Sequence, residues 1–381
     1  MVKTGIGIIG CGERIRTLVR ILSGLEKNIQ IVSVYDPDKE VAGNFAKTFC
    51  PDSRVHKNYH ELLRDSKVEW VMIGSWNCFH KEQIIASFKA GKNVFCEKPI
   101  ATTLDDHLEI KKAYLHYKKL FMIGFTLRYS PHYQKIKKII EGRSIGKIVS
   151  LEFNETLDFN HGGLIMGGWR RLRKNAGPHV LEKCSHDVDI VNWIVKSKVT
   201  KVASFGGCNF FLPENEYHIE RIGKDKNGKE AYFASLSPSD LNPFVSDKDI
   251  VDNQVAIIEF ENGVRASFHT NLNSGIPERR LYILGTEGAV RSDVLTGKIT
   301  VKRIGFEQTE KDESTEAKGL HGGGDLPLCM NLAEAMTRGT VPVTGFEDGL
   351  KSAVICFGID KAMKTGSVVE MEPFWKKIDF R

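Results

Sequence analysis

The sequence predicts an α/β protein: a doubly wound parallel sheet followed by an α+β domain with a mostly antiparallel, open sheet. Up to about residue 126, short apolar runs alternate with helical patterns. From about Lys147 the strand patterns instead pair as hairpins across glycine turns. At 381 residues the chain also exceeds a typical single domain of about 150 residues. We therefore expect two domains, over residues 1–126 and 127–381.

The first domain contains five short apolar runs of the kind that form strands covered on both faces. These runs are Ile6–Ile9, Gln30–Tyr35, Trp70–Ile73, Asn93–Cys96 and Leu120–Phe125. Helical patterns lie between them, at Arg14–Leu22, Lys39–Phe49, Lys81–Ala90 and Leu104–Tyr117. The alternation of strand and helix predicts a parallel sheet with helices on both faces.

In the second domain the clearest hairpin joins Asn253–Phe260 to Val264–Leu272 across an Asn-Gly turn. Further strands are expected at Arg280–Leu284, Ala289–Leu295 and Ile299–Arg303. Helices are expected at Val180–Val195, Leu328–Thr337 and Glu347–Met363. This order predicts an antiparallel sheet with helices on one face.

Composition narrows the function classes. Lys plus Arg number 54 and Asp plus Glu 48, so the net charge of +6 is mild; it suits small anionic ligands and does not indicate nucleic acid. The eight cysteines are scattered without a Cys-x-x-Cys pair, which argues against a metal site and fits a reducing compartment. No secretory signal and no apolar stretch near the ~20 residues of a membrane span is present. We expect a soluble, cytoplasmic protein without a nucleic-acid or membrane partner.

A glycine-rich turn follows the first predicted strand. In Gly10-Cys-Gly12-Glu-Arg-Ile15, Gly10 suits a tight turn and Gly12 lets the backbone approach a pyrophosphate at a helix N-terminus. The segment Gly5–Gly10 also matches the glycine pattern, but it lies inside the strand, where no helix begins. Ile15 replaces the third glycine, and Glu13 adds a negative charge. Alone, the turn fits cofactor binding and an ordinary strand–helix connection equally well.

Asp36 adds to the cofactor interpretation. It ends the second predicted strand, 24 residues after Gly12, near the ~20 expected for a carboxylate that accepts a ribose hydroxyl. The same aspartate can instead begin an Asp-Pro turn, and both roles can hold together. A carboxylate there repels a 2′-phosphate, so NAD is favoured over NADP, although Lys39 nearby moderates the preference.

Several motifs lie at the ends of the predicted strands and in the second domain. They are Ser75-Trp76-Asn77 with His80, Ala90-Gly91-Lys92-Asn93-Val94, Glu97-Lys98-Pro99, Arg128-Tyr129-Ser130-Pro131, Gly168-Trp169-Arg170 and the segment Glu182–Asp189. In this order they resemble the glucose–fructose oxidoreductase and inositol dehydrogenase (Gfo/Idh/MocA) family of NAD(P)-dependent oxidoreductases. The resemblance covers nearly the whole chain. It implies a Rossmann domain that binds the dinucleotide and a second domain that binds substrate and forms homodimers or homotetramers.

The segment from Val180 carries the predicted acid/base chemistry. On one helix, Glu182, His186 and Asp189 would share a face opposite the apolar stripe, and a carboxylate beside a histidine can orient its ring. An exposed polar helix face is the alternative. The family pattern Asp-x-Gly-x-His-x-x-Asp implies that Glu182, His186 and Lys98 are catalytic. Glu182 stands where the family has Asp, which moves the carboxylate by one methylene, and Cys184 stands where the family has Gly.

The expected site residues form two sets. The cofactor set is Gly10, Gly12, Glu13, Arg14, Ile15, Asp36, Ser75, Trp76, Asn77, His80, Glu97 and Lys98. The substrate set is Lys98, Arg128, Trp169, Lys183 and His186. Four alternatives stay open: Trp76 can pack in the core, Asn77 can cap a helix, Lys183 should face away from Glu182 on a helix, and His321–Asp325 can close over a site or form a surface loop.

Together these features predict an NAD-dependent dehydrogenase that oxidises a secondary hydroxyl of a sugar, an amino sugar (including a nucleotide-linked one) or a cyclitol. Two other functions remain open. One is a redox-neutral glycosidase that keeps its NAD bound, as in some proteins resembling this family. The other is a catalytically silent dinucleotide-binding regulator, which the eroded glycine pattern at Ile15 and Glu13 would suit.

Overall fold

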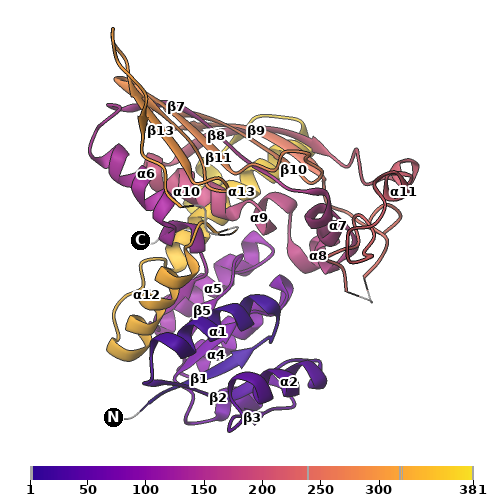
Figure 1. The fold of residues 1–381 in the computed structure, drawn as a ribbon. Coiled ribbons are helices and arrows are strands. Elements are labelled where there is room, and N and C mark those ends of the chain that lie inside the picture. Colours follow the sequence, from indigo (N-terminus) through magenta and orange to yellow (C-terminus); the bar gives the residue numbers. More distant parts are fainter. Residues whose placement is uncertain (1–2, 238–239, 317–318, 320, 380–381) are drawn as a thin grey trace. The chain divides into compact units, whose positions relative to one another are not determined.

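The computed structural model describes residues 3–237, 240–316, 319 and 321–379 and divides into two compact units (Figure 1). The first unit comprises residues 1–130 and 323–351, and the second comprises residues 131–322 and 352–381. The predicted fold class is confirmed: one sheet is parallel, and the other is mostly antiparallel.

The first unit is built on a six-stranded sheet with the order β3-β2-β1-β4-β5-β6, in which every neighbouring pair is parallel. Its elements are β1 (Thr4–Ile9), α1 (Glu13–Leu25), β2 (Ile29–Tyr35), α2 (Lys39–Phe49), β3 (Arg54–Val55), α3 (Tyr59–Arg64), β4 (Trp70–Ile73), α4 (Asn77–Lys89), β5 (Asn93–Cys96), α5 (Leu104–Tyr117), β6 (Phe121–Ile123), a short 3₁₀ helix (Thr126–Tyr129) and α12 (Asp325–Arg338). All five predicted strands are present. The sequence did not indicate β3, whose two residues are exposed and carry no apolar pattern.

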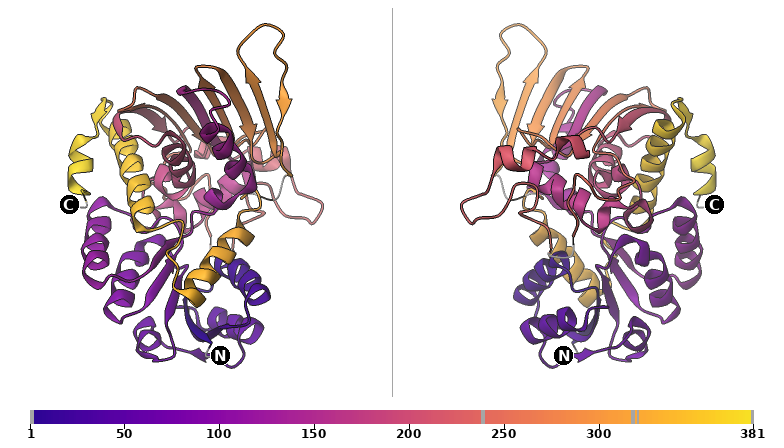
Figure 2. Two further views of the ribbon diagram at one scale, coloured as in Figure 1. Left: turned by 90° about the vertical axis from the view of Figure 1, so that its left-hand side faces the viewer. Right: turned by 90° about the vertical axis from the view of Figure 1, so that its right-hand side faces the viewer.

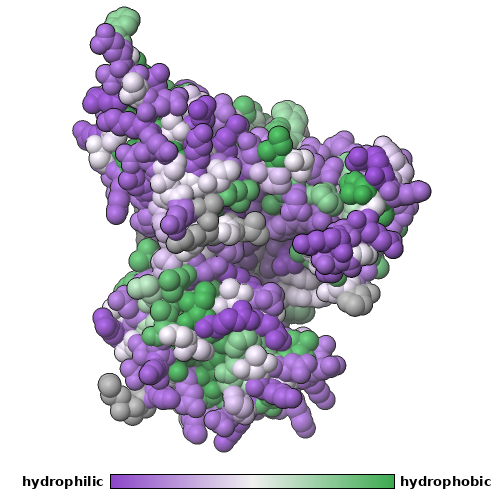
Figure 3. All heavy atoms as spheres, viewed as in Figure 1, coloured by the Kyte–Doolittle hydropathy of each residue, from purple (hydrophilic) through white to green (hydrophobic). Residues whose placement is uncertain are grey.

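The segment 323–351 returns to the first unit, which differs from the expected division at residue 126. Leu328, Cys329 and Leu332 of α12 are fully buried in one core with Leu18 and Leu22 of α1. The α12 helix therefore supplies the apolar cover of α1. Figure 3 shows hydrophobic side chains gathering over these two helices.

Polar contacts tie the same segment to the end of the parallel sheet. The Tyr129 hydroxyl donates to Asn331 Oδ1 at 2.9 Å and lies 3.1 Å from Thr344 Oγ1, which donates to the Ile123 carbonyl at 2.8 Å. Residues 127–130 and 323–351 thus belong with the parallel sheet, although nothing in their local sequence distinguishes them from the second unit.

The second unit is built on a nine-stranded sheet with the order β14-β13-β12-β11-β7-β10-β9-β8-β15, in which only β7 and β10 pair in parallel among the described strands. The predicted hairpins are present as β9–β10 and β11–β12–β13. Helices α6, α10 and α13 lie along one face of this sheet (Figures 1 and 2). On β9 the residues facing them, such as Ala256 and Ile258, are buried, whereas Val255 and Ile257 on the other face are exposed.

The second unit contains a longer series of helices and strands. They are α6 (Pro131–Glu141), β7 (Ile148–Thr156), α7 (Phe159–Gly167), a 3₁₀ helix (Trp169–Arg171), α8 (Arg173–Ala176), α9 (His179–Glu182), α10 (Ser185–Val195), β8 (Val199–Gly207), a 3₁₀ helix (Pro213–Asn215), α11 (His218–Ile222), β9 (Asn253–Phe260), β10 (Arg265–Asn271), β11 (Arg280–Gly285), β12 (Gly288–Asp293), β13 (Lys298–Arg303), β14 (Lys311–Asp312), α13 (Phe346–Thr365), β15 (Val369–Glu370) and α14 (Glu372–Lys377). The chain passes from the first unit to the second within α13. Of the helices described, none is both long enough and apolar enough to cross a membrane.

The prediction of one continuous helix over Val180–Val195 is wrong. The segment forms α9 and α10, which are separated at Lys183 and Cys184. Cys184 has φ −98° and ψ 4°, in the bridge region where the regular helical ladder stops. Its carbonyl then accepts hydrogen bonds from the Asp187 and Val188 amides, both at 3.0 Å, and α10 begins. The apolar periodicity continues across the break, so the sequence pattern did not reveal it.

Candidate active site

The glycine turn after β1 has the shape that a pyrophosphate requires. Gly10 has φ +85°, and a Cβ atom on it would lie 2.5 Å from the Ser75 nitrogen, so only glycine fits. Gly12 is the N-cap of α1 and makes no side-chain cap, and the nearest atom to a Cβ built on it is 4.0 Å away. The backbone of Gly12 is therefore open to approach. Since the first-turn amides of a helix have no acceptor within it, they are available to an anion.

Ile15 stands where the glycine pattern has its third glycine. Its side chain fits because Gly74, on the sheet side of the contact between α1 and the sheet, has no side chain. Its side chain is fully buried, and a Cβ atom on Gly74 would lie 2.1 Å from Ile15 Cγ1. Gly74 directly follows β4. The close approach of helix and sheet is thus kept, but the missing side chain belongs to the strand end instead of the helix.

Asp36 holds the end of β2 to the glycine turn. Its Oδ2 accepts a hydrogen bond from the Cys11 amide at 2.8 Å, and its Oδ1 accepts one from the Asp38 amide at 2.9 Å. The Asp-Pro turn expected as an alternative is therefore present. The carboxylate also stands beside Gly10 and Gly12, as the ribose interpretation requires.

The residues after β4 divide into exposed and buried groups. Trp76 is 44% exposed, and its ring stacks on Phe79 with 6.5 Å between centroids, so Trp76 does not pack in the core. Asn77 is buried and is the first residue of α4, whose N-cap is Trp76, so Asn77 is not the cap. The His80 ring is fully buried between the carbonyls of Pro99 at 2.7 Å and Ser75 at 3.0 Å. Both nitrogens of His80 therefore bind backbone and leave no group for a cofactor.

Arg14 binds carboxylates of its own unit. Its guanidinium donates to Glu97 Oε1 at 2.9 Å, to Asp325 Oδ1 at 2.6 Å and to Thr126 Oγ1 at 2.6 Å. Burial disfavours the charge, but Glu97 and Asp325 outweigh burial and raise the pKa of Arg14. The expected cofactor residue Arg14 thus fixes the carboxylate of Glu97, immediately before Lys98, and ties α12 to the glycine turn.

Arg128, expected to touch substrate, is buried in the first unit. Its Nη1 lies 2.9 Å from Asp348 Oδ1, and the side chain is 6% exposed. This ion pair joins the 3₁₀ helix to the returning segment 323–351. The structure therefore gives Arg128 a structural ion pair, whereas the sequence suggested a ligand contact.

In the second unit, Glu182, His186 and Asp189 are 6%, 4% and 1% exposed. The alternative of an exposed polar helix face is therefore wrong. Glu182 Oε1 accepts a hydrogen bond from Arg170 Nε at 2.9 Å, and the Arg170 guanidinium lies over the Trp169 ring at 4.3 Å from its centroid. The Gly168-Trp169-Arg170 motif thus supplies the cation that holds Glu182, a role that the sequence did not show.

Lys183 emerges at the break between α9 and α10, so it does not face away as an uninterrupted helix would require. Its Nζ lies 3.4 Å from Glu155 Oε1 on β7 and 3.3 Å from His161 Nε2 on α7. Burial lowers the pKa of His161 to about 4, with Lys183 adding to the effect, so this ring is neutral near pH 7. Lys183, His161 and Glu155 therefore form a polar group beside Glu182.

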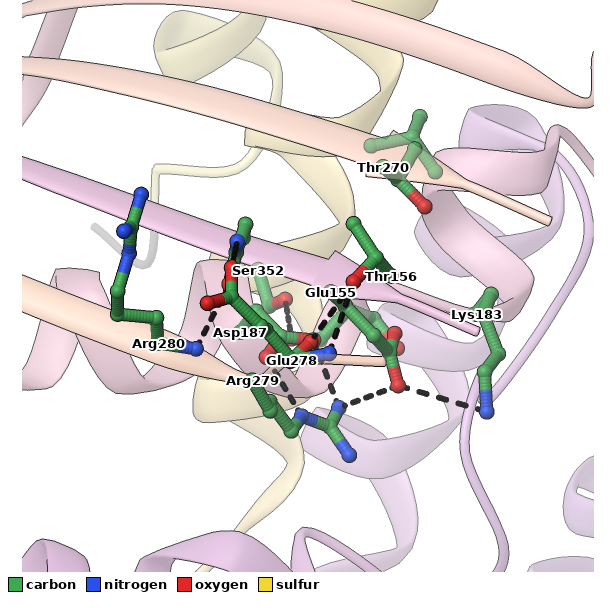
Figure 4. A network of polar contacts seen from close by, with 12 residues as sticks. Glu155, Thr156, Lys183, Asp187, Thr270, Glu278, Arg279, Arg280 and Ser352 are labelled. Atoms are coloured by element: carbon green, nitrogen blue, oxygen red, sulfur yellow. Dashed lines mark hydrogen bonds and ion pairs between the residues drawn. The ribbon is translucent and has the colours of Figure 1, made fainter. Parts of the chain in front are cut away.

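Arg279 closes a buried ion network around these residues (Figure 4). Its Nε and Nη2 each donate to a different Asp187 oxygen at 2.7 Å, and Nη2 lies 3.1 Å from Glu155 Oε1. Burial opposes its charge, but Asp187 and Glu155 outweigh burial and raise the pKa of Arg279. The main chain at Glu278, one residue before, exchanges hydrogen bonds with Thr156 at the end of β7. The network thus connects β7, the loop before β11 and α10.

His321 lies beside the predicted catalytic histidine. The rings of His186 and His321 are edge to face, with 5.9 Å between centroids and 61° between planes. Gly322 and Gly323 follow with φ +54° and +78°, so the chain turns sharply after His321. The segment His321–Asp325 therefore does not form a simple surface loop, since its two ends contact His186 and Arg14. Among the described residues, no group of three His, Cys, Asp or Glu side chains could hold a metal ion.

A glycine turn after β1, a carboxylate after β2 and a doubly wound sheet define a dinucleotide-binding unit of the Rossmann class. A family model described as "Oxidoreductase family, NAD-binding Rossmann fold" matches residues 4–125, and its companion, "Oxidoreductase family, C-terminal alpha/beta domain", matches residues 137–371. The chain belongs to this Gfo/Idh/MocA family of oxidoreductases, and its first unit is an NAD-binding domain.

Curated relatives are distant. YteT of Bacillus subtilis, named only as an oxidoreductase, is 25% identical over 363 residues, covering 84% of each chain. An inositol 2-dehydrogenase/D-chiro-inositol 3-dehydrogenase of Shouchella clausii is 34% identical over 147 residues, or 37% of this chain and 41% of that protein. An inositol 2-dehydrogenase of Burkholderia multivorans is matched over 54% of its length. The chain thus spans about half or less of the inositol dehydrogenases it matches.

Solved structures show the same fold over the whole chain. A levoglucosan dehydrogenase in complex with NADH and levoglucosan has a TM-score of 0.79 at 19% identity, covering 97% of this chain and 100% of that one. The WlbA dehydrogenase of Bordetella pertussis, in complex with NADH and UDP-GlcNAcA, has a TM-score of 0.77 at 18% identity, covering 97% and 98%. At these identities the similarity establishes the fold alone.

The two glycines of the turn are expected to differ when each is replaced by alanine. Gly10→Ala places a Cβ against Ser75 in a left-handed conformation and should lower the unfolding free energy by at least about 1–2 kcal/mol. Gly12→Ala has space for its methyl group and should fold normally, but that group occupies the backbone surface offered to the pyrophosphate. NADH affinity of Gly12→Ala, measured by fluorescence titration, should fall by about tenfold or more. Wild-type affinity in this variant would contradict the assignment of the turn.

Replacing Arg279 should destabilise the second unit. Arg279→Met leaves Asp187 and Glu155 buried without their principal cation, and removal of one partner from such a network costs about 3–5 kcal/mol. The neighbouring Arg280→Met is the matched control, because Arg280 is 38% exposed and lies 4.0 Å from Glu152, where a pair is worth about 1 kcal/mol or less. Urea unfolding followed by fluorescence measures both. Equal effects in the two variants would show that the network is not essential.

Proposed function

We propose that this protein is an NAD-dependent dehydrogenase that oxidises a secondary hydroxyl of a sugar, an amino sugar or a cyclitol. The observation that carries the proposal is the burial of His186 together with Glu182 in the second unit, at the positions of the family's acid/base pair. A histidine that is 4% exposed, with buried carboxylates in the same segment, fits a role in proton transfer better than that of an ordinary solvated surface residue. The names of the relatives, which include inositol, levoglucosan and nucleotide-sugar dehydrogenases, support this substrate class.

The chain's own residues fit NAD. The amides after Gly12 would hold the pyrophosphate, Asp36 would accept a ribose hydroxyl and disfavour a 2′-phosphate, and the exposed Trp76 ring would offer an apolar surface to a base. When bound, the nicotinamide supplies the hydride acceptor. Glu13, Ser75 and Asn77 remain candidate neighbours of the cofactor, on the first turn of α1 and at the end of β4.

The protein groups would move one proton and stabilise one charge. His186 takes the proton of the substrate hydroxyl, and Lys98 donates a hydrogen bond to the same oxygen as negative charge develops there. Arg170 holds Glu182, and Glu182 would in turn orient the His186 imidazole. Lys183 and Trp169 would bind other hydroxyl groups of the substrate. Arg14 fixes Glu97 and thereby the main chain that carries Lys98.

A substrate panel separates this function from the two alternatives. Sugars, inositols, levoglucosan, nucleotide sugars and aryl glycosides are incubated with NAD, and both NADH absorbance and aglycone release are followed. A dehydrogenase forms NADH, whereas a redox-neutral glycosidase releases aglycone without net NADH. NADH binding without any turnover would support a silent regulator and contradict the proposal.

Removal of either proposed catalytic group should abolish turnover without abolishing cofactor binding. Lys98→Met and His186→Ala are expected to lower kcat by about 10²–10⁴-fold, the range of general acid–base catalysis. Lys81→Met and His218→Ala are matched controls, because Lys81 forms a surface ion pair and His218 lies on the short helix α11. Full activity in either site variant on a substrate from the panel would refute the assignment.

We further propose that the outer face of the nine-stranded sheet joins two copies of the chain. Phe205, Val255 and Ile257 share this face and are 68%, 50% and 61% exposed, although outer faces are normally polar. Balanced ion pairs, Arg265–Glu259 and Arg280–Glu152, flank them, as a self-complementary surface requires.

We also propose that the protein works in the reducing cytoplasm, because its eight cysteines are free and most of them are buried.

Light scattering tests the subunit contact. Ile257→Glu should lower the molar mass to that of a smaller assembly, because it buries a charge at the centre of the face. Ile276→Glu, at a position 78% exposed and outside the sheet strands, should leave the molar mass unchanged. A wild-type protein that is monomeric at all concentrations would contradict the proposal.

A further inference from the structure

His321 is a residue to which the proposed function gives no role, yet its ring lies edge to face with His186 at 5.9 Å between centroids. His186 is 4% exposed, whereas His321 is partly exposed. The two rings thus lead from a buried position toward the solvent. The left-handed main chain at Gly322 and Gly323 makes the turn that directly follows His321.

Oxidation of a hydroxyl leaves a proton to be removed. The C–H and O–H bonds of the substrate carbinol break and a C=O bond forms; the C–H electron pair leaves as hydride, and the O–H proton goes to His186. Before the next turnover this proton must reach the solvent. A side chain that is 4% exposed has little direct access to bulk water, so a second group is needed to carry the proton outward.

The other histidines and the basic side chains of this region are poorly suited to that task. Burial lowers the pKa of His161 and of His179 to about 4, so neither ring holds a proton near pH 7. Lys183 is paired with Glu155, with its Nζ 3.4 Å from Glu155 Oε1. Arg170 and Arg279 do not release protons in this pH range. The remaining imidazole next to His186 is His321.

We propose that His321 relays the proton between His186 and solvent in each turnover. His321 acts through His186 and is therefore a positioning and relay residue. The two rings are in edge-to-face contact, and in the proposed relay one water molecule or substrate hydroxyl bridges a nitrogen of each ring, which is sufficient for proton transfer. In the reverse reaction His321 takes a proton from the solvent and passes it to His186 before the carbonyl is reduced. This inference rests on the proposed dehydrogenase function.

The test separates hydride transfer from proton release. In a weakly buffered stopped-flow experiment, NADH absorbance reports hydride transfer and a pH-indicator dye reports the proton, with the most active substrate of the panel. In the wild type the two signals should coincide. His321→Phe keeps an aromatic ring against His186 but carries no proton, and His321→Gln keeps hydrogen bonding without proton exchange. In both variants proton release should lag by about tenfold or more, and added imidazole should remove the lag.

The matched control is His218→Gln, whose partly exposed histidine lies on α11, and it should behave as the wild type. KM and NADH affinity should be unchanged in all variants. Coincident signals in His321→Phe and His321→Gln would overturn the relay and leave the dehydrogenase standing. A rate loss that imidazole does not restore would show that His321 only orients His186, which also overturns the relay. If the wild type forms NADH with no substrate of the panel, the proposed function fails, and the relay fails with it.

Discussion

Buried carboxylates need cations, and this requirement organises the second unit. Glu155, Glu182 and Asp187 are all less than a tenth exposed, and each lies within 3.5 Å of a lysine or arginine nitrogen. Their partners come from separate parts of the chain, so the pairing requirement holds β7, α9, α10 and the loop before β11 together (Figure 4). His186 lies between two of these carboxylates in sequence, so its surroundings follow from the pairing.

The first unit meets the same requirement with one arginine. Arg14 in the first turn of α1 binds Glu97 after β5 and Asp325 at the start of α12. The Glu97 carboxyl group packs directly against Gly124, where a Cβ atom would lie only 2.9 Å from it. One partly buried cation thus links the glycine turn, the strand end before Lys98 and the returning segment. This explains why residues 323–351 belong to the unit that they rejoin.

The parallel strands could be read from the sequence because strands buried on both faces must be continuously apolar, as in Trp70–Ile73. The glycine turn could also be predicted, since the positive φ of Gly10 is a local backbone feature that requires glycine. Contacts between residues that are far apart in the sequence could not be predicted from it. Ile15 departs from the glycine pattern, and the space for its side chain comes from Gly74, which lies far away in the sequence. Arg279 is 92 positions from its partner Asp187. The break at Cys184 was hidden because the apolar spacing runs through it. Of the candidate site, the sequence indicated the residue types, whereas the ion pairs that hold them depend on the fold.

The energetics of these networks bear on their purpose. A buried ion pair gains little stability over apolar residues of similar volume, since desolvation offsets most of the attraction. A chain selected only for stability could fill the space around Asp187 with apolar side chains. The desolvation cost of these charges has a purpose if the charges fix the main chain on either side of His186. Bidentate pairing, such as that of Arg279 with Asp187, restricts angle as well as distance. Glu182 accepts a hydrogen bond from Arg170 Nε, so the carboxylates that precede and follow the histidine in the sequence are both fixed by directional contacts. An imidazole positioned by packing alone would keep more rotational freedom, whereas a main chain fixed on either side of His186 by paired carboxylates helps to preorganise the ring for proton transfer.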